Sequence, residues 1–274
     1  MMNFNLDSQT YGATRFKSAV PASLAKRTLS GSQPHSAEGA FGIILLQQIN
    51  AGIAQFVYTV CQIRKDLALD FSMTGPVWLT HIALKNENQI DIAGVNPVCL
   101  KQGQFNMIRS SSIAGTFYME RDNGYQTVSI YYAGKQLQEL LPFFPFLNAF
   151  IREPNPNKPM LLFRNHHWMD ALLPDITGHL LHCPYRGNLR QLYFDYKIKE
   201  LFLFHNRENA IATIPKGLND RTIELINEGK YINEAGFGQP ITLHKIAKQP
   251  GMSEVKLRNS FRQLFGTGIV EYLL

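Results

Sequence analysis

Short apolar runs, separated by turn residues, fill the chain from residue 41 to residue 132. They span Phe41–Gln48, Gln55–Ile63, Val77–Leu84, Gln89–Ile92, Val98–Ile108, Thr116–Glu120 and Gln126–Tyr132, and they are rich in β-branched and aromatic residues. Runs of this length and composition predict strands, and their regular spacing predicts an antiparallel sandwich or barrel. Asn123-Gly124 is the strongest turn signal, because both residues tolerate the positive φ angles of a tight hairpin.

The chain before this region has a different residue composition. Residues 1–37 are rich in Ser, Ala, Thr and Gly, and they show no sustained strand or helix period. Such a segment lacks the apolar face that a packed strand or helix needs. We therefore expect a flexible arm over residues 1–37, followed by a β-rich domain over residues 38–133.

After Gly134 the apolar residues follow helical spacing. Helices are predicted over Lys135–Leu141, over Asn165–His182, where Pro174 should break or kink the chain, and over Leu189–Phe204. The last helix is apolar on most faces, which is typical of a helix that is deeply buried or shared with a second subunit. Residues 134–213 are therefore expected to form a helical linker that is either buried or the dimerisation segment of a homodimer.

A pair of short helices is predicted within the last segment, residues 214–274. The first has its apolar face at Leu243, Ile246 and Ala247, and the second at Leu257, Phe261 and Leu264. Between them Gly251 supplies the positive φ angle of a sharp turn, and Ser253 can cap the second helix by accepting backbone N–H groups. Two short helices joined in this way are typical of the helix-turn-helix unit, whose second helix lies in the major groove of DNA.

The outward face of the second predicted helix is basic. From residue 241 to residue 266 the chain has five basic residues, against the single acid Glu254. Arginine pairs bidentately with guanine and asparagine with adenine, so Arg258 and Asn259 are candidates for base contacts. A helical hairpin whose exposed face is only solvated is the alternative interpretation.

The same segment resembles a known family. The pattern Leu243-x-x-Ile246-Ala247-x-x-x-Gly251-Met252-Ser253-x-x-x-Leu257-x-x-x-Phe261-x-x-x-Phe265-Gly266, followed by Glu271-Tyr272-Leu273, is similar to the first helix-turn-helix of AraC/XylS transcription regulators. Pro250 departs from that pattern and is expected to shorten the first helix. The resemblance is confined to residues 241–274.

This resemblance implies roles for five side chains. The family positions that match Val255, Arg258 and Asn259 make most base contacts, and Lys256 and Arg262 would lie beside phosphates. Because Val255 can touch only a thymine methyl group or a sugar, base specificity would depend mainly on Arg258 and Asn259. The implied function is a sequence-specific transcription regulator whose partners are double-stranded DNA and a small-molecule effector.

The resemblance also implies a fold, because sensor domains of this family are often jelly rolls. The expected class is α+β: a cupin-like antiparallel β-sandwich or barrel over residues 38–133 as the sensory domain, the helical linker, and an all-α, partial helix-turn-helix domain over residues 214–274. Family members carry a second helix-turn-helix, whereas this sequence ends at Leu274. We therefore expect a fragment or a naturally shortened regulator that binds DNA weakly.

A second resemblance concerns the effector. Residues 183–204 are similar to the helix that precedes the DNA-binding domain in the subgroup of the pyochelin (siderophore) regulator, as are Lys256-Leu257 and Phe265-Gly266-Thr267. This similarity implies an iron–siderophore complex as the effector.

Charge, hydropathy and cysteine content indicate which partners and which cellular location to expect. A net charge of +6 permits a polyanionic partner. No stretch approaches the ~20 apolar residues of a membrane span, and the N-terminus has no secretory signal, so no membrane partner and a cytoplasmic location are expected. The three cysteines lie far apart without a Cys-x-x-Cys pair, which favours buried thiols over disulfides or a zinc site.

Enzyme chemistry has little support. The common catalytic and cofactor motifs are missing from the sequence, so neither catalytic residues nor a cofactor are expected. Among the histidines at 166, 167, 179 and 182, the last two have a three-residue spacing that could ligate a metal, but Pro174 separates the two pairs and no Cys or carboxylate completes a familiar site. A cupin-type metalloenzyme would find only His81 in the β region. The alternative function is a ligand-binding or dimerising protein without independent DNA binding.

Aromatic side chains of the β region are the candidates for a ligand pocket. They are Phe56, Tyr58, Trp78, Phe105, Phe117, Tyr118, Tyr131 and Tyr132. Ligand pockets are mostly apolar, but a sandwich also needs large side chains to fill its core. For each of them singly, we predict a core position.

Overall fold

The computed structural model describes residues 3–12, 14–51, 54–95, 97–145, 147–151, 159–163, 166–168, 172–211, 226 and 253–265. The chain divides into two compact units. One comprises Met1–His167 with Thr177–Glu200, and the other comprises Trp168–Ile176 with Leu201–Leu274. The first unit contains the sheets, and the described part of the second is mainly helical.

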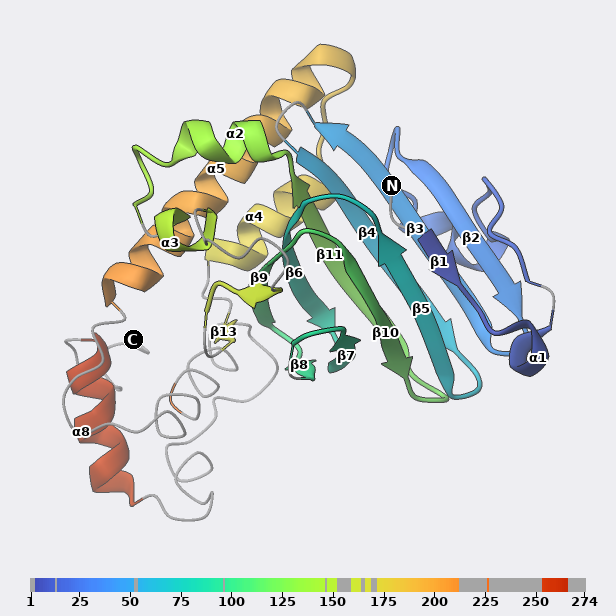
Figure 1. The fold of residues 1–274 in the computed structure, drawn as a ribbon, viewed down its shortest axis with the longest axis horizontal. Coiled ribbons are helices and arrows are strands. Elements are labelled where there is room, and N and C mark those ends of the chain that lie inside the picture. Colours follow the sequence, from blue (N-terminus) through green and yellow to red (C-terminus); the bar gives the residue numbers. More distant parts are fainter. Residues whose placement is uncertain are drawn as a thin grey trace. The chain divides into compact units, whose positions relative to one another are not determined.

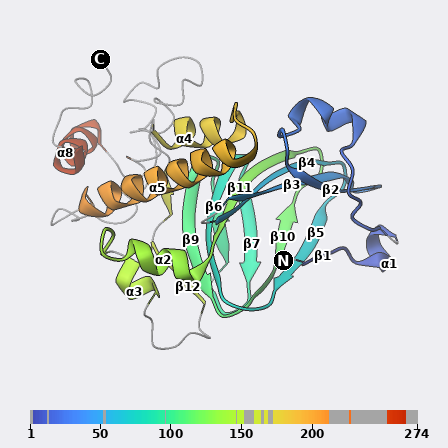
Figure 2. The same cartoon turned by 90° about the horizontal axis from the view of Figure 1, so that it is seen from above.

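Two antiparallel sheets face each other in the first unit (Figures 1 and 2). One has the order β1 (Asn3–Asn5), β5 (Leu67–Met73), β10 (Ile113–Met119), β7 (Asn88–Ile92), β8 (Val98–Leu100). The other has the order β12 (Met160–Leu161), β9 (Gln104–Ser110), β6 (Val77–Lys85), β11 (Gly124–Tyr132), β4 (Ala54–Ile63), β3 (Gly42–Ala51), β2 (Gln33–Gly39). The predicted antiparallel sandwich is therefore confirmed.

The structure adds strands that the apolar pattern did not predict, among them β5. The predicted single run Val98–Ile108 also forms two strands, β8 and β9, which belong to different sheets. The cause is Gly103, whose φ angle of +86° turns the chain between them.

The described part of residues 3–37 forms secondary structure that the sequence pattern did not predict. It contains β1, helix α1 (Ser8–Tyr11), the 3-10 helix η1 (Ala22–Arg27) and β2, and both strands pair with neighbours in the sheets. Leu24 of η1 is fully buried. The side chain of Gln47 on β3 accepts the N–H of Leu29 at 2.6 Å and donates to the carbonyl of Arg27 at 3.0 Å. These two hydrogen bonds between the Gln47 side chain and the backbone fasten the end of η1 and the residues after it to the sheet.

The predicted hairpin at Asn123-Gly124 is also wrong. The turn falls one step earlier, where Asp122 has a φ angle of 60°. Gly124 is already the first residue of β11, and β10 and β11 lie in opposite sheets. The connection therefore crosses between the layers. The backbone N–H of Arg121 donates to the Asp66 carboxylate at 2.8 Å within this crossing.

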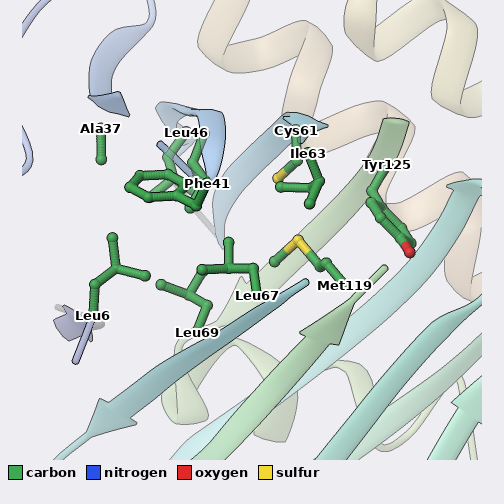
Figure 3. Close-up of a cluster of buried hydrophobic side chains, with 11 residues drawn as sticks. Leu6, Ala37, Phe41, Leu46, Cys61, Ile63, Leu67, Leu69, Met119 and Tyr125 are labelled. Carbon is green, nitrogen blue, oxygen red and sulfur yellow. The ribbon is translucent and has the colours of Figure 1, made fainter. Parts of the chain in front are cut away.

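The core between the sheets consists of two clusters of apolar side chains. The first contains Leu6, Ala37, Phe41, Ile44, Leu46, Cys61, Ile63, Leu67, Leu69, Met119 and Tyr125. Figure 3 shows its members from both sheets pointing toward one another. The second contains Phe71, Val77, Leu79, Ala83, Ile90, Ile92, Val98, Leu100, Ile108 and Ile113. Phe4 and Phe117 contact both clusters.

Helices follow the main strands of the two sheets in the chain. They are α2 (Gly134–Leu140), α3 (Leu147–Ile151), α4 (Leu172–Leu181) and α5 (Gly187–Ile211), and β13 (His167–Trp168) precedes α4. In α5, Phe194 packs edge-on against Phe56 of β4, with ring centroids 5.5 Å apart. Pro174 lies in the first turn of α4, where its missing N–H has no helical partner to lose, so it does not break that helix. No helix among the described residues is long and apolar enough to cross a membrane.

The described helix of the C-terminal segment is α8 (Glu254–Phe265). It begins after Ser253, whose Oγ atom accepts the backbone N–H of Lys256 at 3.2 Å. This confirms the predicted cap. The predicted first helix at residues 242–247 and the turn at Gly251 lie outside the described residues.

The cysteines are free thiols in three different environments. Cys61 is buried, Cys183 is half-buried and Cys99 is exposed. The expectation of buried thiols is therefore right for Cys61 and wrong for Cys99.

Candidate functional site

A cavity lies inside the sandwich, beside the first apolar cluster, five of whose members line it. It leaves about 40 Å³ in which the centre of a water-sized sphere can move. Its lining comes from both sheets: Phe4, Leu46, Val57, Thr59, Cys61, Leu69, His81, Asn88, Gln89, Phe117, Tyr118, Met119, Tyr125, Thr127, Ser129 and Tyr131. Three of the predicted pocket aromatics, Phe117, Tyr118 and Tyr131, line this cavity, whereas Phe56, Phe105 and Tyr132 are buried elsewhere.

Polar side chains on neighbouring strands of the larger sheet line this cavity. Thr127 of β11 is paired with Thr59 of β4, and Ser129 of β11 is paired with His81 of β6. Directly paired residues of an antiparallel sheet point to the same face, so the four side chains form a continuous polar belt, which we call the interior belt. Polar groups in an apolar interior lower stability unless they are hydrogen-bonded, so the position of this belt indicates a binding site.

His81 is the chemically distinctive member of the interior belt. Its side chain is 2% exposed, and its Nδ1 atom lies 2.8 Å from the Oγ atom of Ser129. Its Nε2 atom is buried and has no hydrogen-bond partner. Burial lowers the pKa of His81 to about 4, so the ring is neutral at pH 7. His81 is thus a neutral member of the cavity lining with one unsatisfied nitrogen.

A second candidate surface is the exposed face of α8. Leu257 and Phe261 of this helix are buried, as the sequence predicts, and so is Ser260. All five sequence-predicted DNA contacts lie on exposed positions: Val255, Lys256, Arg258, Asn259 and Arg262. Val255 is 69% exposed. The structure thus gathers these five residues outside the packed side of one helix.

A third feature is an apolar stripe on α5. Leu189, Leu192 and Tyr196 are 64%, 66% and 62% exposed. Their spacing of three and four residues places them on one face of the helix. Phe194 and Ile198 on the other side are fully buried. The predicted helix is therefore buried on one face and exposes large apolar side chains on another.

The four clustered histidines do not assemble into a metal site. His166 bonds through Nδ1 to the Asn106 amide at 2.9 Å, and the His167 ring contacts the Phe163 ring in a tilted arrangement with centroids 4.0 Å apart. His182 bonds to the carbonyl of Gly178. Among the described residues, no three His, Cys, Asp or Glu side chains lie close enough together to hold a metal ion.

Sequence reasoning missed the role of the interior belt. A local signal for it exists, since Thr127 and Ser129 occupy inward positions of β11, where an apolar side chain is usual. The pairing of Ser129 with His81 depends on strands that are 48 residues apart in sequence, so no local pattern could have revealed it.

No family model matches the chain, and no curated protein matches it. Solved structures show distant likenesses. An AraC-like transcriptional activator, CuxR, is 12% identical with a TM-score of 0.40, over 95% of this chain and 82% of that one. An RmlC-like cupin from Shewanella frigidimarina is 12% identical with a TM-score of 0.28, over 37% of this chain and 84% of that one. Protein NMB1881 from Neisseria meningitidis is 17% identical with a TM-score of 0.24, over 32% and 82%.

Proposed function

We propose that this protein is a DNA-binding transcription regulator that responds to a small molecule. The observation that carries the proposal is the surface of α8. A helix capped by Ser253 buries Leu257 and Phe261 and exposes Lys256, Arg258, Asn259 and Arg262. This is the arrangement that a recognition helix needs, because one face must pack on its own domain while the other enters the major groove.

The exposed residue types match the chemistry of DNA. Arg258 can pair with the O6 and N7 atoms of guanine, and Asn259 with the N6 and N7 atoms of adenine, each contributing roughly 1–3 kcal/mol of base discrimination. Lys256 and Arg262 are suited to phosphates, which fix the position of the helix without selecting a sequence. Val255 can contact a thymine methyl group.

The cavity in the sandwich supports the effector half of the proposal. Phe4 lines it from β1, so a molecule bound there would contact the N-terminal segment. The cavity is far below the roughly 300–1,000 Å³ of a typical ligand pocket. A compact effector therefore fits better than the iron–siderophore complex that the second resemblance implies.

The alternative function is a ligand-binding or dimerising protein without DNA binding of its own. The exposed apolar stripe on α5 favours a homodimer. A homodimer is compatible with both functions, since dimeric regulators bind two half-sites. Dimerisation alone thus does not separate the two candidates, and DNA binding does.

The decisive experiment selects bound sequences from a random double-stranded DNA pool and then measures affinity by fluorescence anisotropy at two salt concentrations. We expect a preferred sequence and an affinity that falls steeply with salt. Arg258→Ala should flatten the sequence preference, while Lys199→Ala, which removes an exposed charge from α5, should change neither preference nor affinity. Absence of binding even at low salt would favour the alternative function.

A further inference from the structure

An open groove lies on the surface of the sandwich, beside the internal cavity. Gln89, Tyr118 and Met119 line both hollows. The volume of the groove is about 570 Å³, within the roughly 300–1,000 Å³ of small-molecule sites. Since an apolar cavity of roughly 150 Å³ holds one benzene molecule, the groove has room for an aromatic ring that carries polar groups.

The lining of the groove contains charges of both signs. Asp66 and Glu120 contribute carboxylates, and Arg121 contributes a guanidinium group. All three residues are exposed. In the part of the chain that the structure describes, no ion pair joins Arg121 to either carboxylate. Opposite charges that share a groove without pairing suit a ligand that itself carries both charges, because each end of the ligand then meets its opposite.

Hydrogen bonds hold the charged part of the groove in place. The Oδ1 atom of Asp66 accepts the backbone N–H of Arg121 at 2.8 Å, and the backbone N–H of Glu120 donates to the hydroxyl of Tyr125 at 2.8 Å. The Oδ2 atom of Asp66 has no hydrogen-bond partner among the described residues, so it can accept an ammonium group. A carboxylate fixed before binding loses little conformational entropy when the ligand arrives.

Aromatic and apolar side chains form another part of the lining. The ring of Tyr11 packs edge-on against Phe41, with centroids 6.0 Å apart, and its hydroxyl accepts the backbone N–H of Ala68 at 3.0 Å. Tyr11 is therefore held from both ends. Tyr118 is 44% exposed, and Met119 belongs to the first apolar cluster. A large apolar group can pack against these side chains.

The charges and the apolar lining together define a ligand class. We propose that the groove binds a free amino acid with an aromatic or large apolar side chain. Its carboxylate pairs with Arg121, its ammonium group pairs with Asp66, and its side chain packs against the tyrosine rings. The inference rests on the proposed function, since it names the chemistry of the effector. It is carried by a fixed carboxylate and an unpaired guanidinium group that line one groove of ligand size.

The test uses phenylalanine and two analogues, each of which lacks one charge. Calorimetry on the full chain at pH 7, without DNA, compares phenylalanine with 3-phenylpropionate, which has no ammonium group, and with phenethylamine, which has no carboxylate. We expect phenylalanine to bind at millimolar concentration or below, and each analogue to bind roughly tenfold or more weakly, because one charged hydrogen bond is lost. Absence of phenylalanine binding, or equal binding of either analogue, would overturn the proposal.

Variants assign each end of the ligand. Arg121→Gln should weaken phenylalanine binding roughly tenfold and leave phenethylamine binding unchanged. Asp66→Asn keeps an oxygen that can accept the N–H of Arg121, and it should weaken phenylalanine binding while leaving 3-phenylpropionate binding unchanged. Arg64→Gln, at an exposed arginine outside the groove lining, is the matched control and should bind like the native chain.

Native affinity in both groove variants would refute the assigned site. Since none of these measurements involves DNA, failure here leaves regulation by DNA binding to its own test.

Discussion

The Nδ1 atom of His81 and the Oγ atom of Ser129 lie 2.8 Å apart, on directly paired positions of β6 and β11. This hydrogen bond satisfies one ring nitrogen, whereas the other, Nε2, is buried without a hydrogen-bond partner. Because the buried His81 ring is neutral in the fold, its protonation should lower the free energy of unfolding. The pH dependence of unfolding measures this effect.

Acid should destabilise the protein through His81. Its pKa is about 4 in the folded state and 6.5 when unperturbed, so the unfolded chain binds the proton more tightly. The stabilising effect of keeping the ring neutral is therefore complete above pH 6.5 and is lost as the pH falls from 6.5 to 4. The expected loss is about 3 kcal/mol by the end of this window. Urea unfolding of the native chain and of His81→Gln at pH 7 and pH 4.5 tests this.

His167 also has its pKa lowered by burial to about 4, and it adds a loss in the same window. The comparison with His81→Gln separates the two contributions. The variant should retain the part that belongs to His167 and lose the part that belongs to His81. Identical pH dependence in both proteins would contradict the assignment.

Loss of the Gln47 amide should release the N-terminal segment. Gln47→Leu removes an acceptor for the N–H of Leu29 and a donor for the carbonyl of Arg27. Each buried backbone group left unsatisfied should lower stability by about 1–3 kcal/mol. Hydrogen exchange should speed up over residues 22–32. Gln48→Leu, on the neighbouring half-buried position of β3, serves as the control, and equal exchange in the two variants would argue against the role of Gln47.

The contribution of the Ser253 cap to the stability of α8 should be measurable independently of DNA binding. Ser253→Ala removes the acceptor for the N–H of Lys256 and should weaken the helix by about 0.5–2 kcal/mol. Ser253→Asp should restore the cap. Circular dichroism and hydrogen exchange over residues 254–258 measure the helix directly. If the cap stabilises α8, the backbone amides of residues 254–258 should exchange faster in the alanine variant than in the aspartate variant.

Alanine substitutions of two arginines of α8 should impair DNA binding in different ways. Arg258→Ala is expected to lower discrimination between bases by roughly 1–3 kcal/mol while retaining affinity for unrelated DNA. Arg262→Ala is expected to weaken binding to all sequences alike and to reduce the salt dependence. Binding measured on preferred and scrambled duplexes distinguishes the two patterns. If both variants behaved alike, the division into base and phosphate contacts would be wrong.

The apolar stripe on α5 should hold two copies together. Leu192→Glu places a charge at the centre of the exposed stripe formed with Leu189 and Tyr196, and it should shift a dimer toward monomer. Lys199→Glu, at an exposed position of α5, changes charge without removing apolar surface. Sedimentation velocity of both variants gives the oligomeric state. If the native chain sediments as a monomer, the stripe is not a dimer interface.

The sequence by itself determined the features that depend on local periodicity. The strands around β3, β4 and β6, the cap at Ser253 and the burial of Leu257 and Phe261 follow from residues within one turn or one strand of each other. The resemblance added expectations for the exposed residues of α8, and the structure places those residues on the surface without testing their roles.

Only the tertiary structure decided the rest. The order of the N-terminal segment depends on Gln47 bonding to Leu29, and the division of the strands between two sheets depends on the turns at Gly103 and Asp122. The polar lining of the cavity depends on the register of β6 and β11, which places His81 beside Ser129. Register between distant strands is set by the packing of whole faces, which no short stretch of sequence contains.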